Sequence, residues 1–563
     1  MVNLQLLPCC GLFGGFLSYL LSTDKSNSPP PSASYPPLMS HWLAFESPLV
    51  QPQIIDMRGG GHLEMVVMEV PHHAWGGGAP GGTVMGFAAV GSAPTYPGPT
   101  ILTARDVPIS VTWSNALGTA PHLLHRNTEP SFLIEASACY PNCGVPTAIH
   151  IHGLENPPKY DGLPTHTFYH NSSFHARYAN RQNAATKVYH DHAWGLAPLN
   201  TWAGLVGAYI VQDAAFEARV GLHDLPDLVF LLQDKLITTD GALVYTDKLP
   251  CQPITPTKWA PESYGSVNTV NGVVMPVATV QARAVRFRWI NAANARAYTL
   301  ALPFASKCRV VATDSGFVQR PSAVPDTAWQ LFPLERVEMV CDFTHDAPGT
   351  TYDVVDTPFQ SSAYTYDPRL LRIRIVASET TPPPPFQWPT SLVALKDLRA
   401  LHVATGGTTR TIGLGETMDM AGCSTHLFLE EAGKIKDIAT IKSTLHCTAG
   451  KVEKWRFHNP TADPHPFHWH LVNAQCGPSE TAINTNELKD VVAVPPRAQG
   501  DISYVCFVAC TPDRFLTVGS TRAATDFGFN ATDEPYLAHC HIMEHEENQM
   551  MAWFRLTETD VQN

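Results

Sequence analysis

Four short segments of this chain each carry two histidines separated by a single residue. In a β-strand, residues i and i+2 point to the same face of the sheet, so each segment presents two imidazoles side by side, whereas a helix would splay them apart. One such pair is weak support for a metal site, but four pairs, two toward each end of the chain, predict one. The pairs are His150-Ile-His152, His190-Asp-His192, His468-Trp-His470 and His539-Cys-His541.

The residue pattern in the rest of the chain also predicts β-strands. Short apolar or alternating runs are interrupted roughly every ten residues by Pro, Gly, Asn and Asp, which is typical of all-β sandwiches and barrels. Charged residues make up 15% and hydrophobic residues 44% of the chain, so it can bury large cores. Four runs illustrate the period-two pattern: Pro108–Trp113, Leu228–Leu232, Ala284–Ile290 and Glu453–Phe457.

The domain organisation follows from length and linkers. A chain of 563 residues has room for about three to four domains of roughly 150 residues. The Pro-rich stretch Thr380–Pro389 is the clearest linker, and a weaker break lies at Asp213–Asp227. We therefore expect three β domains at 41–215, 216–385 and 386–563, after an N-terminal segment 1–40. The histidine pairs fall only in the first and third domains.

The ligand types identify the metal. The paired histidines have no accompanying Cys-x-x-Cys pairs, which argues against zinc fingers. Cys540, with His545 five residues on, Met550 five further and a distant histidine, matches a blue-copper site with a weak axial thioether. Because strand side chains alternate, His539 and His541 should point away from the face that Cys540 uses. With His465 and His545 added, the four segments supply ten histidines; two serve the Cys540 site, and eight remain for a second site with three coppers.

These segments resemble those of the multicopper oxidases, which are built from three cupredoxin domains and couple one-electron oxidations to reduction of dioxygen to water. The bacterial spore-coat laccases, bilirubin oxidases and phenoxazinone synthases look most similar. Their hallmark is a terminal HCHxxxHE followed by two methionines, here His539–Glu546 and then Met550-Met551. The resemblance covers about residues 48 to 558. It extends to Tyr96–Ile101, Leu199–Ile210, Val270–Pro276, Arg286–Asn291 and Glu335–Glu338.

The resemblance implies a role for each ligand and four copper ions per chain. The residues similar to type 1 ligands are His465, Cys540, His545 and Met550. Those similar to the type 2 pair are His150 and His468. Those similar to the six ligands of the binuclear type 3 pair are His152, His190, His192, His470, His539 and His541. Asp161 and Glu546 match acids that relatives use near the trinuclear cluster, where dioxygen reduction consumes protons.

The resemblance implies dioxygen and a small phenolic, aromatic or tetrapyrrole donor as substrates. One alternative is a metallo-oxidase of Fe(II), Mn(II) or Cu(I), and another is a copper-binding structural protein with incidental turnover. Hard cations prefer carboxylate oxygens, and near the type 1 ligands only Asp463 favours a metal ion. One carboxylate makes a poor cation site, so we expect aromatic donors to react better than Fe(II).

Charge and the N-terminus bear on partners and localisation. A net charge of −13 argues against nucleic-acid binding. Leu4–Leu21 is apolar and precedes a Ser/Pro-rich stretch, which favours a secreted or secretory-pathway protein. A membrane anchor or an ill-ordered tail are the alternatives, and this segment is the one candidate for membrane contact. Thirteen cysteines are compatible with an oxidising compartment, but their connectivity cannot be read from the sequence.

Overall fold

We analysed a computed structural model of the chain. It describes residues 37–133, 137–246, 260–360, 364–378, 386–419, 424–436, 438, 444–498 and 500–559. The apolar N-terminal segment and the first part of the Pro-rich linker lie outside these residues. Within them, no helix is both long and apolar enough to cross a membrane.

The first part of the chain forms two sheets, with strand orders β1-β4-β9-β8-β6 and β3-β2-β5-β7. Two helices, α1 (Ala197–Ala203) and α2 (Ala214–Arg219), flank the last strand of this part. The strands are β1 (Ile54–Asp56), β2 (Gly61–His72), β3 (Gly82–Ala89), β4 (Gly98–Ala104), β5 (Ile109–Asn115), β6 (Ile149–His152), β7 (Ser173–Tyr178), β8 (Ala185–Asp191) and β9 (Val206–Gln212).

The middle part also forms two sheets. Their orders are β13-β12-β10-β15-β20-β17-β18, with β11 paired to β10, and β14-β22-β21-β16-β19. The strands are β10 (Asp227–Ile237), β11 (Leu243–Val244), β12 (Val267–Val270), β13 (Val273–Val274), β14 (Val277–Gln281), β15 (Ala284–Asn291), β16 (Tyr298–Ala301), β17 (Cys308–Thr313), β18 (Gly316–Ala323), β19 (Trp329–Leu331), β20 (Arg336–Asp342), β21 (Thr351–Asp356) and β22 (Arg369–Val376).

The last part repeats the two-sheet plan, with orders β25-β24-β23-β27-β31-β29 and β26-β33-β32-β28-β30. Its short helices are α3 (Leu398–Thr405), η6 (Asp513–Leu516) and α4 (Met543–Glu547). The strands are β23 (Thr409–Met418), β24 (Ser424–Glu431), β25 (Lys434–Lys436), β26 (Leu445–Thr448), β27 (Val452–His458), β28 (His465–Trp469), β29 (Asn473–Gly477), β30 (Val491–Val494), β31 (Tyr504–Ala509), β32 (Tyr536–Cys540) and β33 (Met551–Thr557).

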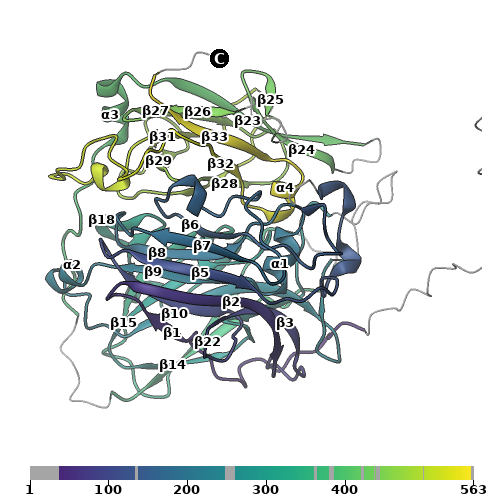
Figure 1. Ribbon diagram of the computed structural model, residues 1–563. Coiled ribbons are helices and arrows are strands. Elements are labelled where there is room, and N and C mark those ends of the chain that lie inside the picture. The colour runs from purple at the N-terminus through teal and green to yellow at the C-terminus, as the bar shows by residue number, and fades with distance from the viewer. Residues whose placement is uncertain are drawn as a thin grey trace, which may run out of the picture.

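The chain therefore folds as three consecutive β-sandwiches of the cupredoxin kind, which confirms the predicted fold class. Each of the four illustrative runs falls largely within a strand: β5, β10, β15 and β27. The exact domain limits at 215/216 and 385/386 stay a prediction. In Figure 1 the last domain lies above the other two, with β28 and α4 facing β6 and α1 of the first domain.

Four disulfides tie strands and loops together among the described cysteines. They join Cys139 to Cys143, Cys308 to Cys341, Cys447 to Cys510, and Cys476 to Cys506. Cys506 and Cys510 are close in sequence but pair with different partners. Cys540 is the one free cysteine of the described residues, and it is buried. Its thiol is therefore available as a ligand.

Candidate metal centres

The histidine pairs are brought together by strand pairing. In the first domain β6 runs antiparallel to β8, with His150 opposite His190. In the last domain β28 runs antiparallel to β32, with His468 opposite His539. Because facing residues of paired strands project from the same side of the sheet, each strand pair offers four imidazoles on one face.

The two groups of four meet across the interface between the first and last domains. His150 stacks on His470 with ring centroids 4.1 Å apart, and His152 stacks on His468 at 3.7 Å. His470 Nε2 lies 3.3 Å from His539 Nε2. All eight residues are at most 1% exposed: His150, His152, His190, His192, His468, His470, His539 and His541. We call this set the eight-histidine cluster.

Hydrogen bonds at the outer edge of several rings fix their orientation. The Nδ1–H groups of His150, His190 and His468 donate to the backbone carbonyls of Asp161, Asp191 and Asp490, at 2.6, 2.9 and 2.8 Å. Such bonds set the tautomer and aim the second nitrogen. In each of these rings Nε2 is left facing the cluster, where it is buried and has no partner among the described residues.

The cluster fits metal ions. His192 also leaves Nε2 unpartnered, His152 leaves Nδ1, and both nitrogens of His541 are unpartnered within the described residues. A buried unpaired nitrogen costs about 1–3 kcal/mol, a penalty that coordination removes. Burial holds the pKa of His150, His152 and His468 well below the usual range, so these rings stay neutral, as ligands must be.

Three carboxylates border the cluster, two of which the sequence singled out. Asp161 Oδ2 accepts from His470 Nδ1 at 2.6 Å. Glu546 Oε1 and Oε2 lie 3.1 Å from His192 Nδ1 and 3.0 Å from His539 Nδ1. The third, Asp490, accepts from His152 Nε2 at 3.1 Å and was missed. No sequence spacing relates Asp490 to the first-domain histidine that it contacts.

Asp490 is the centre of a buried ionic group drawn from all three domains. Arg336, at the start of β20, forms two bonds of 2.7 Å to its two oxygens. Lys187 of β8 lies 3.5 Å from Asp490 Oδ2. Gly153 permits this packing, because its φ is +85° and a Cβ there would lie 2.4 Å from Asp490 Oδ2. The two cations hold the pKa of Asp490 well below its usual range despite burial.

A second site lies on the opposite face of β32. Cys540 Sγ is 3.6 Å from His465 Nδ1 and 3.8 Å from His545 Nδ1, and the two Nδ1 atoms are 3.2 Å apart. Met550 is fully buried, and its carbonyl accepts from the Cys540 amide at 2.9 Å. The tripeptide 539–541 thus contributes to both sites. One thiolate and two imidazoles in this arrangement suit copper.

Comparisons with known proteins also support a copper-binding protein. Two family models, both described as multicopper oxidase, match residues 142–215 and 424–560. Multicopper oxidase LPR1 homolog 1 of Oryza sativa subsp. japonica is 31% identical over 527 residues, which cover 85% of this chain and 85% of the relative. This chain belongs to the multicopper oxidase family.

This multicopper oxidase is also similar to bacterial proteins. A laccase of Bacillus subtilis is 28% identical over 490 residues, which cover 82% of this chain and 89% of the relative. The crystal structure of the McoA multicopper oxidase from the hyperthermophile Aquifex aeolicus has a similar fold. Its TM-score is 0.68 at 19% identity, over 91% of this chain and 100% of that chain.

The protein is therefore a copper-dependent oxidoreductase that uses dioxygen as acceptor, as the sequence predicted. This sets aside the alternative of a structural protein. Which residue binds which copper ion is our proposal, supported by the geometry above: the type 1 ligands at the Cys540 site, and the type 2 and type 3 ligands in the eight-histidine cluster.

We expect Cys540→Ser to abolish the intense blue absorption band of the copper-loaded multicopper oxidase, because the soft thiolate is lost. Copper content should fall by about one ion per chain, since the eight histidines on the other face are unchanged. His468→Ala is the reciprocal control: it should keep the band and lose cluster copper. A blue Cys540→Ser protein would show that the site is misassigned.

We expect Asp490→Asn to lower the melting temperature by several degrees. The substitution leaves buried Lys187 without its carboxylate partner and Arg336 with only Asp314, at 3.6 Å, and breaking a buried ion pair in this way costs about 3–5 kcal/mol. Asp397→Asn is the matched control, because Asp397 and Arg399 form an exposed pair at 3.8 Å that should contribute about 0–1 kcal/mol. Equal melting temperatures for the two variants, measured by calorimetry, would contradict the ionic role of Asp490.

Proposed function

We propose that this multicopper oxidase takes electrons from a hard divalent cation such as Fe(II) or Mn(II) at the edge of His545. The observation that carries the proposal is the contact of His545 Nε2 with Glu262 Oε1, at 2.9 Å. Glu262 comes from the middle domain and its side chain is 17% exposed, so the carboxylate lies between solvent and the Cys540 site.

Two further carboxylates interact with Glu262. Asp463 lies just before β28 and Glu416 lies on β23, and both are half-buried. Burial, followed by the negative charge of Glu262, raises the pKa of Asp463. Burial and the charges of Glu262 and Asp463 raise the pKa of Glu416. Three crowded carboxylates repel one another, and a hard divalent cation would relieve that repulsion through oxygen ligands.

His545 connects this carboxylate group to the redox site. Its Nδ1 faces Cys540 and His465, while its Nε2–H donates to Glu262. A cation held by Glu262 would thus be separated from the proposed type 1 site only by the imidazole ring of His545. When bound, copper supplies the one-electron redox chemistry of both sites; the protein supplies cation binding, orientation and the short route between them.

Protons for dioxygen reduction can be held by Asp161 and Glu546. Both are about 1% exposed. Asp161 Oδ1 is buried and makes no hydrogen bond within the described residues. Glu546 Oε2 lies 3.0 Å from His539 Nδ1, but that nitrogen bonds the Cys540 carbonyl, so this oxygen also accepts no hydrogen bond there. Each carboxyl group therefore has an oxygen able to carry a proton beside a histidine of the cluster, which is the placement that general acid catalysis needs.

Phenolic, aromatic or tetrapyrrole donors are the second candidate substrates. The similarity to a Bacillus subtilis laccase favours them. Outer-sphere oxidation of such a donor needs no carboxylate, only access to the imidazole edge. The sequence alone favoured these donors because it offered a single carboxylate, Asp463, whereas Glu262 and Glu416 are far from it in the chain and were not considered.

We expect Glu262→Gln, Glu416→Gln and Asp463→Asn each to lower kcat/KM for Fe(II) by about tenfold or more. Each removes a charged oxygen ligand, and tenfold corresponds to about 1.4 kcal/mol. The blue band and turnover of an aromatic donor should change little. Glu480→Gln, an exposed carboxylate paired with Lys454, is the control. Unchanged Fe(II) oxidation in all three variants would contradict the cation site and favour aromatic donors as the substrates.

We expect Asp161→Asn and Glu546→Gln to slow reoxidation of the reduced protein by dioxygen by about 10²-fold, the lower range for a lost general acid. Bleaching of the blue band by the reductant should keep its rate, because the Cys540 site lies on the other face of β32. Stopped-flow absorbance measures both steps on one sample. Loss of copper with normal turnover per copper would instead indicate a structural role.

A further inference from the structure

We propose that a cleft between the first and last domains binds a multiply charged oxyanion of the phosphate type. We call it the arginine cleft. Its volume is about 530 Å³, within the range of small-molecule sites. It shares no lining residue with either candidate metal site and is lined mainly by the turn after β4, the loop between β7 and β8, and residues 514–526. Its four basic residues are Arg105, Arg181, Arg514 and Arg522.

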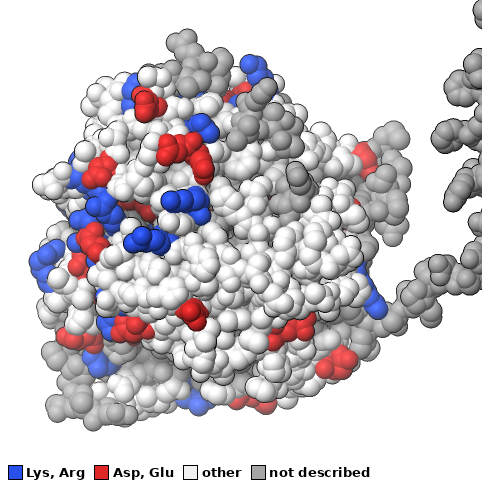
Figure 2. All heavy atoms as spheres, viewed as in Figure 1, with Lys and Arg blue, Asp and Glu red and all other residues white. Residues whose placement is uncertain are grey.

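The charge balance of the arginine cleft favours an anion. Only two acidic residues, Asp106 and Asp526, line it beside the four arginines. The chain as a whole carries a net charge of −13, so the excess of arginine in this cleft is opposite in sign to the overall charge. Figure 2 shows Lys and Arg side chains gathered with a few acidic ones at the left of the displayed face, the side on which α2 lies in Figure 1.

The arginines keep unused donors. Arg514 bonds both oxygens of Asp106 through Nη1 alone, at 2.6 and 2.9 Å. Arg522 uses Nε and Nη1 for the carbonyls of Asp526 and Arg181, at 2.7 and 3.1 Å. Guanidinium groups bind phosphate oxygens with paired N–H donors, and these side chains still have such donors to offer.

Arg181 is the key residue, because it makes no ion pair with any described residue. Its guanidinium packs on Gly528, whose φ is +82° and where a Cβ would lie 1.7 Å from Nη1. The glycine therefore allows a close approach that positions this side chain. Arg522, with a side chain only 8% exposed, donates to the Arg181 carbonyl and holds the backbone beneath it.

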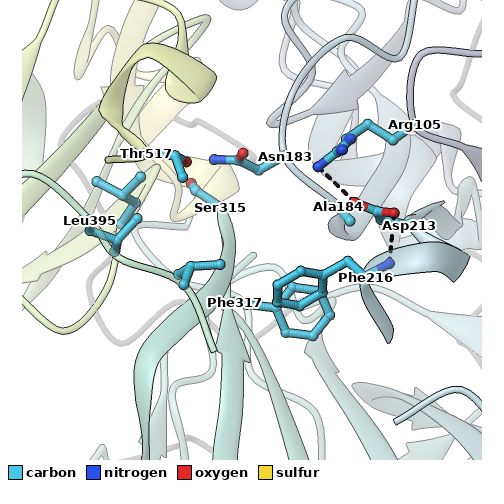
Figure 3. Close-up of a pocket in the computed structure, with 11 residues that line it drawn as sticks. Arg105, Asn183, Ala184, Asp213, Phe216, Ser315, Phe317, Leu395 and Thr517 are labelled. Atoms are coloured by element: carbon cyan, nitrogen blue, oxygen red, sulfur yellow. Dashed lines mark hydrogen bonds and ion pairs between the residues drawn. The ribbon is translucent and has the colours of Figure 1, made fainter. Parts of the chain in front are cut away.

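The ligand would occupy the outer cleft and not the chamber below it. Figure 3 shows that chamber, in which Arg105, Asn183 and Thr517 lie above Phe216, Phe317 and Leu395. Arg105, Asn183 and Thr517 line both spaces, and Asp213 holds Arg105 at 2.7 Å. The chamber has a volume of about 30 Å³, which is room for roughly two waters and is too small for the ligand itself.

Binding would join the two domains that share the eight-histidine cluster. Arg105 and Arg181 belong to the first domain, while Arg514 and Arg522 belong to the last. A ligand bound only by the folded interface stabilises the protein by mass action. Free phosphate and the phosphoryl groups of a larger small molecule share this chemistry, and the size of the cleft favours the larger ligand.

Calorimetric titration of the full-length, copper-loaded protein tests the proposal, with inorganic phosphate and inorganic triphosphate as separate probes at constant ionic strength. We expect saturable binding and a rise in melting temperature with each probe. Triphosphate should bind more tightly than phosphate if the natural ligand carries several phosphoryl groups. Equal affinity would identify free phosphate. Absence of saturable binding of both probes would overturn the proposal.

Variants separate the cleft from other anion sites, including the copper ions themselves. Arg181→Gln should weaken triphosphate binding at least tenfold, and Thr521→Glu should do so through an added negative charge in the lining. Arg320→Gln is the control, because Arg320 is exposed and outside the cleft. Equal affinities for Arg181→Gln, Thr521→Glu and the control would place the anion elsewhere and overturn the proposal.

Discussion

The eight-histidine cluster can form only where two strand pairs from opposite ends of the chain face each other. Antiparallel pairing of β6 with β8 and of β28 with β32 gives four imidazoles to each side. Stacking of His150 on His470 and of His152 on His468 then joins the sides. The cluster therefore requires the first and last domains to dock in one relative position.

The middle domain contributes none of the proposed ligands among its described residues, yet it supplies a charged partner to both sites. Arg336 binds Asp490, which accepts from His152 of the cluster. Glu262 accepts from His545 of the Cys540 site. Burying Arg336 and Lys187 is costly unless their charges are paired, so the ionic group forms fully only when all three domains have docked. The middle domain therefore completes the surroundings of both sites.

Much of the fold, and the clustering of the candidate ligands, could be predicted because both depend on local rules. Alternation of side chains along a strand is readable from three residues, and it predicted that Cys540 and its flanking histidines face opposite ways. Asp490, Glu262 and Arg336 escaped because their contacts depend on domain docking, which no spacing encodes. The disulfides show the same limit: Cys506 pairs with Cys476 across β31 and β29, not with nearby Cys510.

For most of these rings the neighbours decide which nitrogen is left for a metal, because a neutral imidazole has one donor and one acceptor nitrogen. Where Nδ1–H donates to a backbone carbonyl, as in His150, Nε2 is left free. Three rings are reversed: Nε2 of His152, His465 and His545 contacts Asp490, Thr461 and Glu262, which leaves Nδ1 to face the site. The contact of Glu262 with His545 therefore has two effects. It fixes the tautomer of a proposed copper ligand, and it places a carboxylate where the proposed cationic electron donor would bind.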